Sequence, residues 1–257
     1  MASYFERVDS FAFKATEHTG GAWNPEDQHI APALGLLAHV VETDRDARRD
    51  DKLPIGRFSY DILGTVPVDA VEVNVQVLRP GRTIELVEAR LAHGGRDVVI
   101  LRAWLMKPHD TKDLEFTPHR RIKPIEEMPT WEPTTTWEGG FISTPEGRRD
   151  LVAPGNASYW VRTPVDLIEG EKVSVVARAA GLFDIANGMA PRVDPTKVAF
   201  PNIDLTAHLF TEPAGEWLGF DTNVSFGPSG IGLTHSIVHD ERGPIGAVSQ
   251  CLTVRPH

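Results

Sequence analysis

The sequence predicts an α+β protein made of two tandem units, each a curled antiparallel sheet wrapped around one long helix. The main observation is a repeat, because shifting the chain by about 146 positions against itself aligns its two halves without a gap. Alternating strands and turns containing Pro or Gly follow in the same order in both halves. Small residues also coincide on the two candidate helices: Ala31 with Ala177, Ala33 with Ala179, and Gly35 with Gly181.

The first half begins with a short strand candidate at 11–16 and a turn at 20–25 that is rich in Gly. An apolar helix follows over Ala33–Val41, with Pro32 near its start, where a missing backbone N–H costs nothing. Beyond the helix the apolar residues recur with a period of two, which is typical of strands. These strands are predicted at 71–77, 84–91 and 98–106.

The second half repeats this order, with a helix predicted over Glu171–Met189. Its strands are predicted at 157–162, 203–210, 217–225, 231–239 and 245–254. The stretch between the halves is different in character, because it holds seven of the 20 prolines together with charged clusters. We therefore divide the chain into an N-terminal unit over 1–106, a Pro-rich linker over 107–156 and a C-terminal unit over 157–257.

The composition excludes several classes of protein. A formal net charge of -10 argues against a nucleic-acid partner, since phosphates need clustered Lys and Arg. The single cysteine, Cys251, excludes an internal disulfide and a cysteine-rich zinc site, and it fits a reducing compartment. No apolar run approaches the roughly 20 residues of a membrane span, and the charged N-terminus is not typical of a signal peptide. We expect a cytoplasmic protein with no bound metal and no membrane partner.

Three segments of the chain resemble those of a known family. Arg79-Pro80-Gly81 follows an alternating strand, and Leu182-Phe183-Asp184 lies on the second predicted helix. The C-terminal part then holds Asn202-Ile203-Asp204-Leu205, Glu216-Trp217-Leu218, Ser249-Gln250 and Arg255. In this order the segments resemble the acyl-CoA thioesterases of the TesB type, whose fold is a double hot-dog. The resemblance implies hydrolysis of an acyl-CoA substrate to free acid and coenzyme A, with no cofactor, and it leaves a homo-oligomer open.

The resemblance also implies which groups act. In this family a helix aspartate, a strand Ser or Thr and a late-strand Gln hold the water that attacks the thioester carbonyl. These roles fall on Asp184, Asn202 and Gln250. Asn202 departs from the family's Ser or Thr, but an amide can still orient a water because it both donates and accepts hydrogen bonds.

The repeat supports this assignment independently. The three polar residues have apolar or small counterparts in the first half, namely Ala38, Gly56 and Trp104. A carboxylate inside an apolar helix such as 180–186 is costly unless it is hydrogen-bonded or takes part in the chemistry. The alternative is that Asp184 only braces a neighbouring loop.

His29 lies just before the first helix, whose start offers free backbone N–H groups to a developing negative charge. We expect His29 to line the substrate site together with Gly35 and Gly181, and the acyl chain to lie in an apolar tunnel between the two helices. The alternative for His29 is that it only caps the helix. The basic residues between Arg45 and Arg57 alternate with aspartates, so they are interpreted as a solvated segment rather than a site for phosphates of coenzyme A.

Two other functions are compatible with the sequence. The stretch 23–29 has a weak likeness to the signature of enoyl-CoA hydratases, although its acid and its His are wrongly spaced around Asn24-Pro25. This leaves a hydratase or dehydratase on the same fold as one alternative. A non-catalytic acyl-ligand binding protein is the other, because Asn202 replaces the expected Ser or Thr. A panel of acyl-CoAs separates the thioesterase, the hydratase and the binding protein, because it can be assayed for both thiol release and double-bond hydration.

Overall fold

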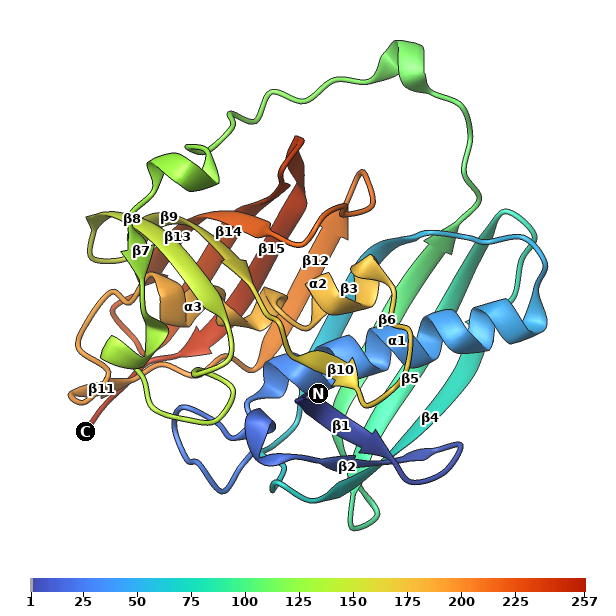
Figure 1. The fold of residues 1–257 in the computed structure, drawn as a ribbon, viewed down its shortest axis with the longest axis horizontal. Coiled ribbons are helices and arrows are strands. Elements are labelled where there is room, and N and C mark those ends of the chain that lie inside the picture. The colour runs from blue at the N-terminus through green and yellow to red at the C-terminus, as the bar shows by residue number, and fades with distance from the viewer. Residues whose placement is uncertain (1) are drawn as a thin grey trace.

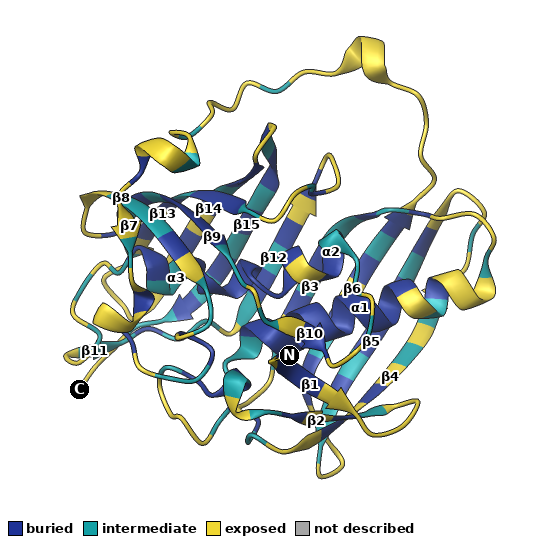
Figure 2. Cartoon of the chain, in the orientation of Figure 1, coloured by how far each residue is buried: buried dark blue, intermediate teal, exposed yellow. Residues whose placement is uncertain are grey.

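The computed structural model describes residues 2–257. It is dominated by one sheet of 14 strands, and a two-stranded sheet adds a small second pairing. Figure 1 shows the large sheet curving around the long helix α1 (Ile30–Arg48) at one end and around two short helices at the other. The buried residues gather where the sheet meets these helices, as the dark regions of Figure 2 show. No helix of the described residues is long and apolar enough to cross a membrane.

The first half contains the predicted helix and strands. Along β4 (Ala70–Arg79), Val71 and Val73 are buried while Glu72 and Asn74 are exposed, because successive side chains of a strand point to opposite faces. Helix α1 is longer than predicted, since charged pairs such as Arg48 with Asp44 (2.7 Å) support its last turns. The remaining strands are β1 (Ser3–Arg7), β2 (Ala12–Ala15), β3 (Ile55–Ile62), β5 (Ile84–His93) and β6 (Arg96–Met106).

The second half follows the same order of strands at nearly the predicted spacing. Its strands are β9 (Asn156–Arg162), β10 (Asp166–Ile168), β12 (Asp204–Leu209), β13 (Leu218–Phe226), β14 (Ile231–Asp240) and β15 (Gly243–Thr253). The short strands β11 (Val198–Ala199) and β16 (Arg255–Pro256) form the small second sheet. Strands β1 and β10 were not predicted, because each is too short to show an alternating pattern.

The two halves share one continuous sheet. Strand β3 pairs antiparallel with β12, and the buried Tyr60 lies opposite the buried Leu205 at this junction. Strands β1 and β10 make a second, parallel link between the halves. Pairing of this kind removes the long exposed edges through which sheets aggregate.

The prediction of one helix over Glu171–Met189 is wrong. The chain forms α2 (Val175–Ala180), then a 3-10 turn over Phe183–Ile185, then α3 (Ala186–Met189). The break follows Gly181, a residue type with low helical propensity. From Leu182 on, the turns are tighter than in an α-helix. The N–H of Leu182 bonds to the carbonyl of Ala179, three residues earlier, at 2.9 Å. The interruption places Asp184 on a tight turn instead of a regular helix.

Helices α1 and α2 cross in direct contact, and this close approach requires small residues such as Gly35 at the crossing. A Cβ atom on Gly35 would lie 2.9 Å from the carbonyl oxygen of Ala177 and 3.0 Å from the Cα of Gly181. Such distances are too short for a side chain, so glycine permits the two backbones to approach each other. The helices therefore leave no room for an acyl chain at this crossing, and the tunnel between them stays a prediction for the rest of their length.

The segment predicted as a linker is partly built into the fold. Its strands β7 (Thr130–Trp131) and β8 (Glu146–Ala153) extend the sheet beside β9. The sheet order is thus β10-β1-β2-β4-β5-β6-β3-β12-β15-β14-β13-β9-β8-β7. The earlier stretch up to about residue 119 arches away from the sheet in Figure 1 and is mostly exposed in Figure 2.

The later stretch of the linker packs against the turn that precedes α1. Gly139 has a φ of +120°, which favours glycine, and a Cβ there would lie 2.5 Å from the carbonyl oxygen of Gly21. The N–H of Phe141 bonds to the carbonyl of Gly20 at 2.9 Å. The fold therefore brings linker side chains next to the start of α1.

Candidate active site

Asp184 is the centre of a buried polar cluster, and only 4% of the surface of this residue is exposed. Its Oδ1 atom accepts a hydrogen bond from the Nδ2 of Asn202 at 2.6 Å and another from the Nε2 of Gln250 at 3.1 Å. The other oxygen, Oδ2, accepts no hydrogen bond from any described residue. Two amides thus hold one oxygen of the carboxylate and leave the second available.

Both amides come from the second half, beside the neighbouring strands β12 and β15. Asn202 lies two residues before β12 and bridges to Leu252 of β15, and its Nδ2 also donates to the carbonyl of Asp204 at 3.1 Å. Because both amide hydrogens of Asn202 meet oxygen acceptors, the orientation of the amide is fixed. Gln250 lies on β15 with 1% of its surface exposed, and its Oε1 is buried without a hydrogen-bond partner.

Burial makes Asp184 titrate near neutral pH. It raises the pKa of the carboxyl from 3.8 to about 7, while the hydrogen bonds from Asn202 and Gln250 hold the pKa below the value that burial alone would give. A carboxyl with a pKa near the working pH can both take up and return a proton. Such a group inside an apolar core is a candidate for catalysis rather than for structure.

His29 lies beside Asp184 but does not form an ion pair with it. Its Nδ1 is 3.7 Å from the Oδ2 of Asp184, and it accepts the N–H of Ala31 at 3.2 Å. Burial lowers the pKa of His29 to about 4, so the ring is neutral at neutral pH and carries its proton on Nε2. The ring also packs on Phe141, with centroids 4.4 Å apart. The capping role considered for His29 is confirmed.

The start of α1 offers one free backbone donor. His29 occupies the N–H of Ala31, and Pro32 has none to offer. The N–H of Ile30 has no partner among the described residues, and Ile30 lines the same cavity as Asp184. A helix start also carries a partial positive charge. The position therefore suits a negative charge that develops on a bound oxygen.

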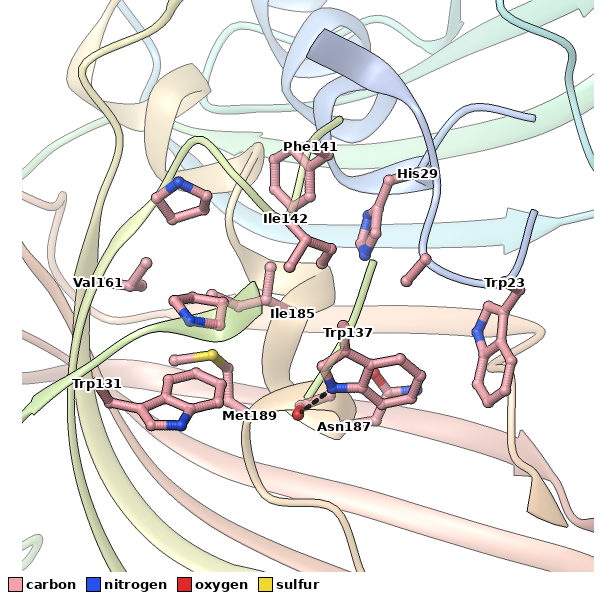
Figure 3. Close-up of a pocket in the computed structure, with 14 residues that line it drawn as sticks. Trp23, His29, Trp131, Trp137, Phe141, Ile142, Val161, Ile185, Asn187 and Met189 are labelled. Atoms are coloured by element: carbon pink, nitrogen blue, oxygen red, sulfur yellow. Dashed lines mark hydrogen bonds between the residues drawn. The ribbon is translucent and has the colours of Figure 1, made fainter. Parts of the chain in front are cut away.

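Two cavities meet at this cluster. The first, of about 350 Å³, is lined by Asp184, Asn202, Gln28 and Ile30 among others. The second is smaller and mostly apolar, and Figure 3 shows Ile142, Ile185 and Met189 facing into it. The two cavities share four lining residues: Ala22, Trp23, His29 and Asn187. A substrate can therefore pass Asp184 with one part in each cavity.

The other predicted site residues lie elsewhere. Gly35 and Gly181 are at the crossing of α1 and α2, where packing alone accounts for both glycines, and their contact with substrate stays a prediction. The basic segment is not simply solvated, because Arg45 is buried and donates to the carbonyl of Leu53 at 2.9 Å. Arg48 and Arg49 bond to the buried Glu85, so these guanidinium groups are already engaged within the fold.

Sequence reasoning missed the linker residues that line the smaller cavity. Trp137 donates its indole N–H to the carbonyl of Gly188 at 2.8 Å, the bond drawn in Figure 3, and Trp131 and Phe141 line the same space. Large aromatic residues in a Pro-rich segment are the signal that could have found them. Such side chains are rarely left in solvent without a packing partner. In the described part of the chain, no group of three His, Cys, Asp or Glu residues is placed to hold a metal ion.

Models of known protein families match both halves of the chain. Residues 19–106 match a family described as "Acyl-CoA thioesterase N-terminal domain". Residues 113–254 match "Acyl-CoA thioesterase C-terminal domain". No curated protein matches the chain.

Solved structures with a similar fold cover almost the whole chain. A conserved protein with a hot dog fold from Alicyclobacillus acidocaldarius has a TM-score of 0.75 at 12% identity, covering 98% of this chain and 96% of its own. The acyl-CoA thioesterase II TesB2 from Mycobacterium marinum has a TM-score of 0.68 at 14% identity, with coverages of 98% and 96%. The tesB protein of Mycobacterium avium subspecies paratuberculosis has a TM-score of 0.65 at 15% identity, with the same coverages. At these identities the likeness concerns the fold alone.

Proposed function

The chain belongs to the acyl-CoA thioesterase family, and we propose that Asp184 is the base of its reaction. The enzyme hydrolyses acyl-CoA thioesters to a free acid and coenzyme A. The observation that carries the proposal is the asymmetry of the Asp184 carboxylate. Asn202 and Gln250 hold its Oδ1, while Oδ2 accepts no bond from the residues that the structure describes, and Asp184 lines the substrate cavity.

The Oδ2 atom takes a proton from the attacking water. One O–H bond of the water breaks as its oxygen bonds to the thioester carbonyl carbon, and the proton moves to Oδ2. The second hydrogen of the water can be accepted by the Oε1 of Gln250, which is buried and lacks a partner. When the C–S bond breaks, the protonated Asp184 returns its proton to the departing sulfur. A pKa of about 7 suits both transfers.

The N–H of Ile30 stabilises the negative charge on the carbonyl oxygen of the tetrahedral intermediate. Donors that are already in place when charge develops lower the barrier without a cost of reorganisation. His29 supports this arrangement, because by capping Ala31 it leaves Ile30 as the free donor at the helix start. Its neutral ring adds no competing positive charge.

The larger cavity suits the arm of the coenzyme. Its lining includes polar neutral groups such as Asn24, Gln28 and Thr65, and the pantetheine arm of coenzyme A is likewise neutral and polar. The Oε1 of Gln28 is buried without a partner there. It can accept an amide N–H of the arm, since a buried acceptor without a partner is costly.

The chain is, in this proposal, a double hot-dog with units at 1–106 and 157–257 and the linker at 107–156. The recurring order of strands and the junction between β3 and β12 support two fused units. The whole site then lies inside one chain, whether or not copies of the chain associate. We also assign the enzyme to the cytoplasm, where acyl-CoA substrates are made and used.

The test is release of free thiol from a panel of acyl-CoAs, with hydration of an enoyl-CoA followed in parallel. The proposal expects thiol release by the wild type and a loss of this release in Asp184→Asn. Hydration without thiol release would support a hydratase instead. Tight binding of acyl-CoA with neither reaction would support the non-catalytic alternative.

A further inference from the structure

We infer that the linker closes the acyl pocket of this enzyme, that Trp131 is its end wall, and that the substrates are thioesters of short acyl chains. The inference rests on the proposed role of the Asp184 site and extends it to the substrate class. It places a specificity-determining residue in a segment outside both hot-dog units.

The smaller cavity is in the position of an acyl pocket. It begins at His29 and Asn187, which it shares with the cavity that contains Asp184, and continues past Ile185 towards Met189. An acyl carbonyl held at Asp184 therefore has this space directly ahead of its hydrocarbon chain. The crossing of α1 and α2 leaves no room for the chain between the helices at that point.

Trp131 forms a braced wall at the linker side of the cavity. Strand β7 holds its backbone against β8, where Trp131 lies opposite Gly147. The guanidinium of Arg149 lies 3.9 Å from the centroid of the Trp131 ring. The same guanidinium donates to the carbonyl of Met189 at 3.1 Å, which ties this wall to α3.

Trp137 makes a second rigid wall. Its indole N–H is bonded to Gly188, and its ring meets Trp23 edge-on with centroids 5.0 Å apart. Phe200 adds a further edge contact at 5.9 Å. Aromatic side chains held on several sides move little, so the cavity cannot widen without breaking these contacts.

The size of the cavity limits the acyl chain. Its volume is about 40 Å³, against about 350 Å³ for the cavity that contains Asp184, so only a chain of a few carbons fits within it. Its lining is mainly apolar, so the group that fits is a short hydrocarbon chain and not a charged or long one.

The experiment measures kcat/KM for acetyl-, butyryl-, hexanoyl-, octanoyl- and dodecanoyl-CoA. The wild type is expected to prefer about four carbons and to lose at least tenfold by eight carbons, since even one methylene that does not fit is worth about tenfold or more. Trp131→Ala should raise the ratio of kcat/KM for octanoyl-CoA over butyryl-CoA by about tenfold, and Trp131→Leu should raise it less.

Trp217→Ala is the matched control. Trp217 also packs against an arginine, with the Arg162 guanidinium 4.9 Å from its ring, but it lines a different cavity. Its removal should leave the chain-length profile unchanged. A wild type equally active on dodecanoyl- and butyryl-CoA would overturn the inference even if the Trp131 variants fail to fold. A ratio that shifts equally in both tryptophan variants would overturn it as well.

Binding separates this inference from the proposed role of Asp184. Non-hydrolysable S-alkyl-CoA thioethers, titrated calorimetrically into Asp184→Asn, should bind with the same length limit as the wild type shows in turnover. If Asp184→Asn keeps its turnover while this length limit holds, Asp184 is not the base, but the inferred acyl pocket stands. If turnover is lost but binding is independent of alkyl length, the base stands and the pocket inference fails.

Discussion

The two halves of the molecule differ most where their helices meet the active site. In the first half α1 runs unbroken, and Ala38, the counterpart of Asp184, is fully buried in it. In the second half the corresponding helix breaks after Gly181, and the break places Asp184 on a turn beside two amides. In the proposed mechanism the two halves therefore contribute different groups: the first supplies a helix start, and the second supplies the proton-accepting carboxylate.

The largest expected effect is that of Asp184→Asn on turnover. The amide keeps the shape and can still accept the bonds from Asn202 and Gln250, but it cannot take a proton. We expect kcat to fall by about 10²–10⁴ with little change in KM. Steady-state kinetics on a single acyl-CoA measures both constants. Near-normal kcat would remove Asp184 from the mechanism and leave it a brace for its loop.

A carboxylate placed at the matching position of the first half should lower the stability of the fold instead. In Ala38→Asp the new group is buried in α1, where the repeat places no amide partners. We expect a loss of about 3–5 kcal/mol in the free energy of unfolding at pH 8, as for other unpaired buried charges. Denaturant titration measures it, and the loss should shrink at pH 4, where the group is protonated. An unaffected stability at pH 8 would contradict the difference drawn between the halves.

Asp184 should also leave a signature in the stability of the wild type. Because burial raises its pKa from 3.8 to about 7, the folded state gains stability from this group below about pH 4 and loses it as the pH rises to about 7. The loss is about 4 kcal/mol at most. The difference in unfolding free energy between the wild type and Asp184→Asn should therefore change by about this amount between pH 4 and pH 8. A constant difference would mean that the pKa is not raised.

The amides should act as one unit with the carboxylate. We expect Gln250→Ala and Asn202→Ala each to lower kcat by about tenfold or more, and the double variant to lower it much less than the product of the two, because groups that serve one step are not additive. Asn202→Thr should be tolerated, since a hydroxyl can still donate to the Oδ1 of Asp184. Loss of turnover in Asn202→Thr with normal turnover in Asn202→Ala would contradict the model.

The sequence was sufficient for the parts of the fold with a strong local pattern. The alternation along β4 led to the sheet. The resemblance to the thioesterase family, supported by the differences between the halves, led to Asp184, Asn202 and Gln250, which the structure brings together. The break in the second helix was not predictable, because one glycine in an apolar run does not end a helix by itself. Its consequence depends on the contact between Gly181 and Gly35, which only the folded chain creates.

The aromatic residues of the linker could mark Trp131 and Trp137 as side chains that need packing partners, but the sequence could not show that they pack beside α3. Trp131 and Trp137 lie in a segment without periodicity, and β8 alternates too weakly to be recognised as a strand. Their place beside α3 follows from tertiary contacts such as the bond from Trp137 to Gly188. Long-range contacts of this kind leave no pattern in a single sequence.

The pH dependence of kcat/KM tests the central claim most directly, because it reports the ionisation of the base in the free enzyme. Asp184 must be ionised to accept a proton, so kcat/KM should rise with pH through about 7 and then level off. Asn202→Ala removes a hydrogen bond that lowers this pKa, so its rise should move to higher pH. A profile that is flat from pH 5 to 9, or one that does not move in Asn202→Ala, would contradict the account.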